Sequence, residues 1–156
     1  MKKKQCVSIL IVASCILIFM ISYPILFQTT LLVKEINKAG GFENGFKIVG
    51  IEKMQVDAAP ISVDVDDSSL VYSELWDKID ATLVKYKRTE IGLPLSSVLY
   101  TFTAVSEDSG AVSVTVDDAK TLHINNNNTT YAIVGNDSGL YEALKTAFAE
   151  FSRKAG

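Results

Sequence analysis

A single histidine is the side chain in this sequence of 156 residues that most invites a catalytic or metal-binding interpretation. His123 lies between Leu122 and Ile124, and alternation along a strand places it on the face opposite their side chains. A catalytic triad or a zinc site needs further partners, and the chain has no second histidine and no cysteine after Cys15. We therefore predict that His123 is a solvent-facing strand residue.

A run of acidic residues offers the oxygen atoms that a calcium ion prefers. Asp64, Asp66 and Asp67 resemble the start of an oxygen-rich calcium loop. An EF-hand beginning at residue 64 requires glycine at position 69 and glutamate at position 75, where this sequence has Ser69 and Leu75. We predict instead a polar strand end that runs into a helix cap.

The remaining candidates indicate structure rather than chemistry. The pairs 107–108 and 117–118 are acidic and fall at predicted turns, where carboxylates bond to the backbone. Trp76, one place from the Leu75 face of a helix, is predicted to belong to the core, with a place covering the side of the helix as the alternative. No glycine-rich phosphate loop follows a predicted strand. We assign no catalytic, cofactor-binding or metal-binding residue and predict no cofactor.

The N-terminal segment, residues 1–27, has the pattern of a membrane anchor. Three lysines at positions 2–4 precede an apolar run from Cys6 to Phe27, interrupted only by three serines and Pro24. About 21 such residues form a helix of about 32 Å, which matches the hydrocarbon thickness of a bilayer. The lysines are expected to stay in the cytoplasm, so the rest of the chain lies outside it.

Two alternatives for this segment remain open. Cleavage as an ordinary secretory signal would release a secreted domain, although the exit from the run has no Ala-x-Ala site. The stretch 12–15, Val-Ala-Ser-Cys, is similar to a bacterial lipobox, and processing there would leave a lipidated Cys15. Cys6 and Cys15 are the only cysteines and point to opposite faces of a helix, so they cannot bridge each other within it.

The charge of the remaining chain excludes two classes of partner. Three of the fifteen basic residues are in the N-terminal segment, so twelve basic residues face eighteen acidic ones and the formal net charge after residue 27 is −6. Nucleic-acid binding and flat adsorption on an anionic bilayer both depend on clustered lysine and arginine. We expect neither.

The first half of the body mixes helix and strand patterns. Leu31 to Gly41 predicts a short helix that continues the anchor as a stalk and ends at glycine. Strands are predicted over 46–56 and 61–65. A helix starting at Ser69 or Ser73 would place Leu75, Ile79, Leu83 and Tyr86 on one face. The competing interpretation is a strand over 83–88.

The second half predicts a β-meander and a closing helix. Apolar residues alternate over 98–104, 112–116, 122–124 and 131–133, and the four asparagines 125–128 form a turn. Leu140, Leu144, Phe148 and Phe151 then repeat at helical spacing. The predicted fold class is α+β, with an antiparallel meander packed against one or two amphipathic helices.

These patterns define three regions and a general role. Residues 1–27 are the anchor or signal-like segment, 28–41 the stalk helix and linker, and 42–156 an extracytoplasmic domain. We predict a non-catalytic binding or accessory module of the cell envelope that contacts the membrane through residues 6–27 and an envelope protein or ligand through its domain. The alternatives are a small hydrolase or metal-dependent enzyme that uses His123 with the acids near Asp64, and a structural subunit of a surface assembly.

Overall fold

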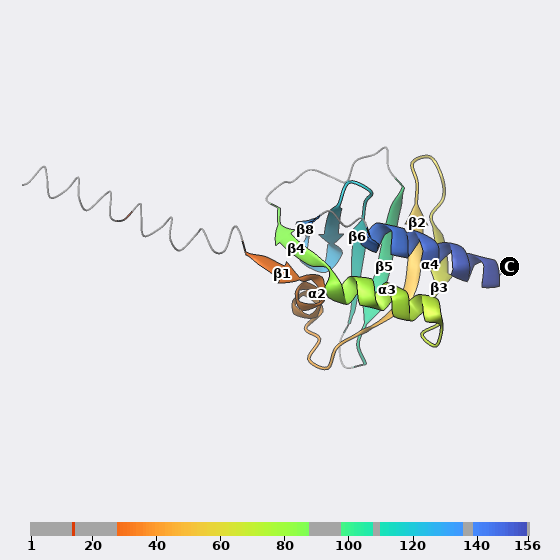
Figure 1. Ribbon diagram of the computed structural model, residues 1–156, viewed down its shortest axis with the longest axis horizontal. Coiled ribbons are helices and arrows are strands. Elements are labelled where there is room, and N and C mark those ends of the chain that lie inside the picture. Colours follow the sequence, from red (N-terminus) through yellow and green to blue (C-terminus); the bar gives the residue numbers. More distant parts are fainter. Residues whose placement is uncertain (1–13, 15–27, 88–97, 108–109, 136–138, 156) are drawn as a thin grey trace, which may run out of the picture.

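The computed structural model describes residues 14, 28–87, 98–107, 110–135 and 139–155 (Figure 1). They form an α+β domain in which an eight-stranded antiparallel sheet is combined with three helices. The predicted membrane segment, with Cys6 and Cys15, lies outside these residues except for Ser14. No helix among the described residues is both long enough and apolar enough to cross a membrane.

The sheet has the predicted meander at its centre. The meander strands are β5 (Leu99–Val105), β6 (Ala111–Val116), β7 (Thr121–Ile124) and β8 (Thr129–Ile133). The flanking strands are β1 (Thr29–Leu31), β2 (Lys47–Met54), β3 (Ile61–Asp64) and β4 (Leu83–Tyr86). Their order is β1-β4-β8-β7-β6-β5-β2-β3, so β1 and β3 are the two edges.

Alternation along the meander builds one face of the core. Phe102 pairs with Val114, which pairs with Ile124, and all three side chains are fully buried. The intervening residues point to the opposite face of the sheet. The predicted alternation of buried residues along the meander strands is therefore confirmed.

The helices cover this apolar face. They are α2 (Leu32–Gly40), α3 (Leu70–Ala81) and α4 (Gly139–Ala155), and α3 and α4 lie side by side across the sheet (Figure 1). The four predicted core residues of α4 are all buried: Leu140, Leu144, Phe148 and Phe151. Ser69 caps α3 by accepting a hydrogen bond from the Tyr72 amide at 3.1 Å, so the earlier of the two predicted starts is correct.

The first difference from the sequence prediction lies between residues 82 and 86. Helix α3 ends at Ala81, and Leu83–Tyr86 forms β4, as the competing strand interpretation predicted. Val84 is fully buried and pairs with Ile133 on one side and Thr30 on the other. Pairing with two neighbouring strands outweighs the helical spacing of Leu83, which remains 42% exposed.

The second difference concerns the stalk. Helix α2 exists and ends, as predicted, at Gly41, whose φ of 65° is left-handed. However, Leu32 and Ile36 are fully buried and belong to the hydrophobic core. Residues 29–31 form edge strand β1, which pairs with β4. The structure therefore includes residues 29–41 in the packed domain instead of leaving them as a stalk outside it.

The asparagine tract forms the predicted turn with specific bonds. The Asn126 side chain donates to the Ala111 carbonyl at 2.7 Å and accepts from the Ser113 amide at 3.4 Å, so it extends the β6–β7 ladder beyond the end of β7. Asn128 then adopts a left-handed conformation with φ of 51°. Asparagine tolerates this conformation better than most residues do.

Candidate functional site

His123 lies where alternation predicts, on the sheet face opposite the helices. His123 is on β7, where it pairs with Thr115 of β6 on one side and with Thr130 of β8 on the other. Its side chain is half-buried. Its Nδ1 atom is 3.1 Å from the Thr130 hydroxyl. Beside it, the buried hydroxyls of Thr101 and Thr115 bond to each other at 2.8 Å. His123 is therefore half-buried in a polar part of the sheet, where it has a structural hydrogen bond, instead of fully facing solvent as predicted.

The acids near Asp64 do not meet His123. Asp64 is on edge strand β3, and three strands separate β3 from β7. With strands about 4.8 Å apart, the two residues are roughly 19 Å from each other. No group of histidine, cysteine and acidic residues in the described part of the chain is arranged to hold a metal ion. The predicted alternative of a hydrolytic site at these residues gains no geometric support.

Asp66 is part of the helix start. Its Oδ1 atom accepts hydrogen bonds from the Ser68 hydroxyl at 2.6 Å and the Ser68 amide at 3.1 Å. The Ser68 hydroxyl is the main cause that lowers the pKa of the Asp66 carboxyl, and the Ser68 amide adds to it. The acidic run therefore forms a polar turn that leads into α3, as predicted.

Among the described acids of the predicted turns, Asp117 is the one that is buried. Its Oδ1 atom accepts from the Thr121 amide at 2.6 Å, which closes the turn between β6 and β7. Its Oδ2 atom is buried with no hydrogen-bond partner among the described residues. Burial raises the pKa of this carboxyl above its usual range. Asp108 lies outside the described residues, and Glu107 is exposed.

Trp76 belongs to an aromatic cluster at the side of the core. It is half-buried, and its ring lies edge-on to Phe46 with 5.0 Å between centroids and stacks on Tyr72 at 6.5 Å. Trp76 therefore packs against the core and also covers the side of α3, which combines the two interpretations of the sequence.

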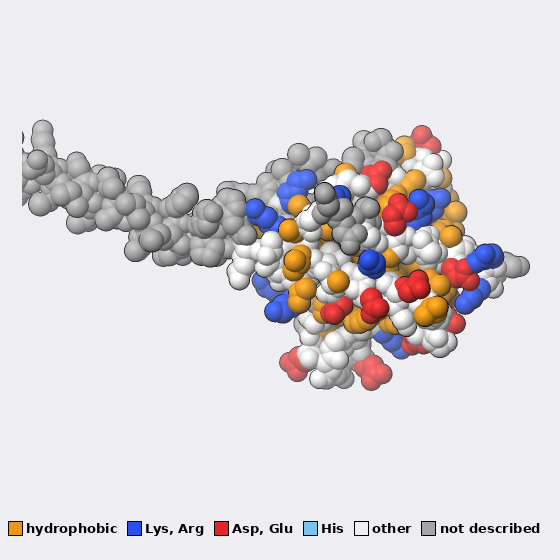
Figure 2. All heavy atoms as spheres, viewed as in Figure 1, with side chains coloured by type: hydrophobic (Ala, Val, Ile, Leu, Met, Phe, Trp, Pro, Cys, Tyr) orange, Lys and Arg blue, Asp and Glu red, His pale blue; other side chains and the backbone are white. Residues whose placement is uncertain are grey.

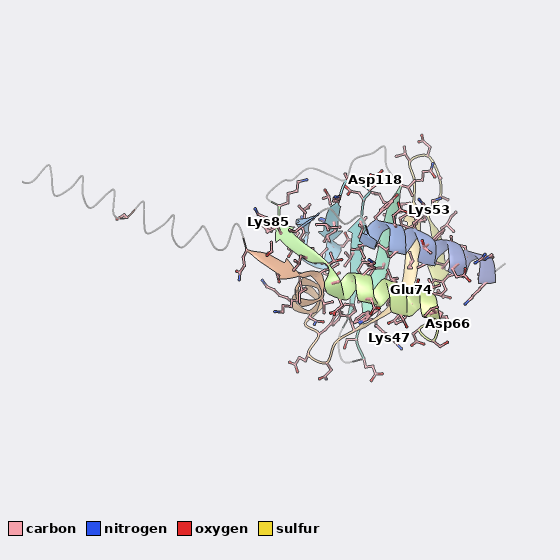
Figure 3. All side chains as sticks on the ribbon, in the orientation of Figure 1. Lys47, Lys53, Asp66, Glu74, Lys85 and Asp118 are labelled. Atoms are coloured by element: carbon pink, nitrogen blue, oxygen red, sulfur yellow. The ribbon has the colours of Figure 1, made fainter. Side chains whose placement is uncertain are left out.

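A groove that the sequence analysis did not identify lies at the β1 end of the sheet. Its volume is about 750 Å³. Helix α2 forms one wall, and strands β1, β4 and β8 together with Gln28 contribute the rest of its lining. Its position can be followed from Lys85, which lies on β4 between two groove residues (Figure 3). Its lining includes Thr30, Lys34, Glu35, Lys38, Tyr86 and Tyr131.

The groove combines aromatic, hydroxyl and charged groups. The Tyr131 hydroxyl donates to the Glu35 carboxylate at 2.7 Å and fixes that charge against the wall. Tyr86, which is 46% exposed, meets the Tyr131 ring edge-on at 6.2 Å. Lys34 and Lys38 are exposed one helical turn apart, and neither forms an ion pair with another described residue. The ionisable side chains of the groove, two lysines and one glutamate, therefore carry a formal net charge of +1.

The face of the domain that α3 and α4 cover carries charges of both signs. Figure 2 shows acidic, basic and hydrophobic side chains intermixed over the face that α3 and α4 cover. The i,i+3 ion pairs Glu142–Lys145 and Glu150–Arg153 belong to the exposed side of α4. Such exposed pairs contribute little to stability and do not form a site.

The groove could not be found from the sequence because its residues come from three separated segments, within 28–38, 83–86 and 129–131. Lys34 and Tyr131 are 97 positions apart, and only the pairing of β1 with β4 and of β4 with β8 brings them together. Comparisons of the chain with known protein families, curated proteins and solved structures find no match.

Proposed function

We propose that this protein is a membrane-anchored, extracytoplasmic binding or accessory module of the cell envelope, without catalytic activity of its own. Residues 6–27 form the anchor, the N-terminal lysines are cytoplasmic, and the domain binds another envelope component. The observation that carries the proposal is the order of the chain. The apolar run ends at Phe27, and β1 and the groove beside it begin within two residues.

The proposed location is supported by length and charge in the N-terminal segment. The apolar run is long enough for one membrane-spanning helix, and three lysines precede it. Beyond the run, Lys34 and Lys38 alternate with Glu35. This difference in charge between the two flanks favours an orientation with the lysines in the cytoplasm.

The proposed binding role is favoured over hydrolysis by geometry. His123 and Asp64 are roughly 19 Å apart across the strands, too far for one to position a proton for the other. The groove, by contrast, combines an exposed aromatic ring with polar and charged groups, which is the composition of many recognition surfaces.

Purification of the full-length protein from its native membrane in mild detergent tests this proposal. We expect a specific companion protein or ligand to be recovered with it in a fixed ratio. Recovery of the protein alone from a membrane fraction would contradict the binding role. Recovery of a shortened protein from the soluble fraction would contradict the anchor and favour a secreted domain.

A further inference from the structure

The two edges of the sheet differ in how well they are protected against pairing with another strand. The N–H and C=O groups along an edge can pair with an added strand unless charge, proline or a covering segment prevents it. Strand β3 carries Asp64 and follows Pro60 directly, which are both protective features. Strand β1, Thr29-Thr30-Leu31, contains neither a charged residue nor a proline.

The less protected edge also adjoins the groove. All three residues of β1 line it, together with Leu83 and Tyr86 of the neighbouring strand β4. A strand added beyond β1 would lie about 4.8 Å from it and would direct every second side chain to the helix side of the sheet. Thr30 points to this side, because it pairs with the buried Val84.

The charge of the groove selects for one kind of added strand. Lys34 and Lys38 are exposed on the α2 wall, and Glu35 between them is already bonded to Tyr131. The chain after residue 27 carries a formal net charge of −6, whereas the ionisable residues of the groove carry two positive charges and one negative charge. Acidic side chains at alternate positions of an added strand would therefore meet complementary charge.

We propose that β1 and the groove beside it bind an extended, acidic peptide segment of a partner protein by β-strand addition. Main-chain hydrogen bonds to the outer edge of β1 hold the segment, and its alternate acidic side chains contact Lys34 and Lys38. Tyr86 supplies an exposed ring for the apolar parts of the segment. This inference names the partner class for the binding role proposed above and does not depend on the orientation of the anchor.

The test uses full-length protein in detergent and a synthetic probe. The probe is a fluorescent peptide of about eight residues that alternates glutamate and valine, compared with one that has lysine in place of glutamate. We expect the acidic peptide to bind at least about tenfold more tightly than the basic peptide in fluorescence anisotropy. The double variant Lys34→Glu with Lys38→Glu is expected to lose that preference.

A matched charge reversal elsewhere controls for net charge. Lys47 and Lys53 lie on β2, which four strands separate from β4 and its Lys85 (Figure 3). The double variant Lys47→Glu with Lys53→Glu changes the net charge by the same amount as the groove variant and is expected to retain the affinity of the unaltered protein. An equal loss of binding in this variant and in the groove variant would overturn the proposed site, because it would reduce the effect to overall charge.

N-methylation of the peptide tests strand addition without altering the protein. The N–H groups of a strand point alternately to its two edges, so methylating only the glutamates or only the valines blocks one edge at a time. We expect one methylated peptide to bind at least about tenfold more weakly while the other binds nearly as well as the parent.

Three results would refute the inference. Equal binding by both methylated peptides would show that main-chain pairing is not used, and equal competition by inorganic polyphosphate would indicate a general anion site. Absence of binding at a peptide concentration of about 1 mM, at which even weak binding is detected, would exclude this peptide class. None of these results affects the membrane test, so failure here is distinguishable from failure of the proposed location.

Discussion

Removal of residues 28–41 is expected to unfold most of the domain. We compare two fragments, 28–156 and 42–156, which differ by β1 and α2. Leu32 and Ile36 are both fully buried, and burying one such side chain contributes about 1.5–3 kcal/mol. Their loss alone costs about 3–6 kcal/mol.

The deletion also removes contacts other than those of Leu32 and Ile36. Tyr131, which is only 5% exposed, loses its hydrogen bond to Glu35 and the helix that shields it from solvent. Strand β4 loses its partner β1 and becomes an edge strand. Because domains of this size are typically stable by about 5–15 kcal/mol, the shorter fragment retains little or no stability.

Urea unfolding monitored by circular dichroism measures this difference. We expect a cooperative transition for 28–156 and either a midpoint far lower or no cooperative transition for 42–156. The single substitution Ile36→Ala in the longer fragment, with an expected loss of about 2–5 kcal/mol, checks the same packing without a deletion. Equal midpoints for the two fragments would refute the packing of residues 28–41 in the core and would favour the predicted stalk outside the domain.

Three substitutions test other parts of the structure. Phe148→Ala is expected to cost about 3 kcal/mol, because the ring is buried against Tyr100 at 5.8 Å, and urea midpoints measure the loss. Tyr131→Phe is expected to cost about 1–2 kcal/mol by leaving the half-buried Glu35 carboxylate without its donor; an unchanged midpoint would contradict that bond. Asp117 has a raised pKa, so its contribution to stability is present below the usual pKa of aspartate and is lost as pH rises through the folded-state value. Asp117→Asn is expected to remove this dependence, and identical stability profiles of variant and parent between pH 4 and 7, about the range concerned, would contradict it.

The sequence predicts the parts of this fold in which a regular pattern is long. Four strands of the meander and helix α4 show their apolar positions without reference to the rest of the chain, and the structure confirms them. Ser69 and the glycine at position 41 mark helix ends through local backbone chemistry. These features depend on neighbours in the sequence and are therefore readable from it.

The sequence is a poor guide where distant pairing decides the structure. Leu83 continues the helical spacing of Leu75 and Ile79, yet it begins β4 because the following Val84 is paired on both sides. Strand β1 has only three residues and adjoins the apolar run, so it shows no alternation of its own. The groove needs both of these strands, which is why its residues could not be recognised before the topology was known.

The proposed location is tested most directly by labelling introduced cysteines in intact cells with a membrane-impermeant maleimide. Ser62→Cys provides an exposed position on β3, and Lys3→Cys provides one before the apolar run. The unaltered protein, with Cys6 and Cys15, is the control for background labelling. We predict that Ser62→Cys reacts in intact cells with an accessible surface, or in spheroplasts, and that Lys3→Cys reacts only after lysis. Labelling of Lys3→Cys in intact cells while Ser62→Cys is protected would contradict the proposed orientation.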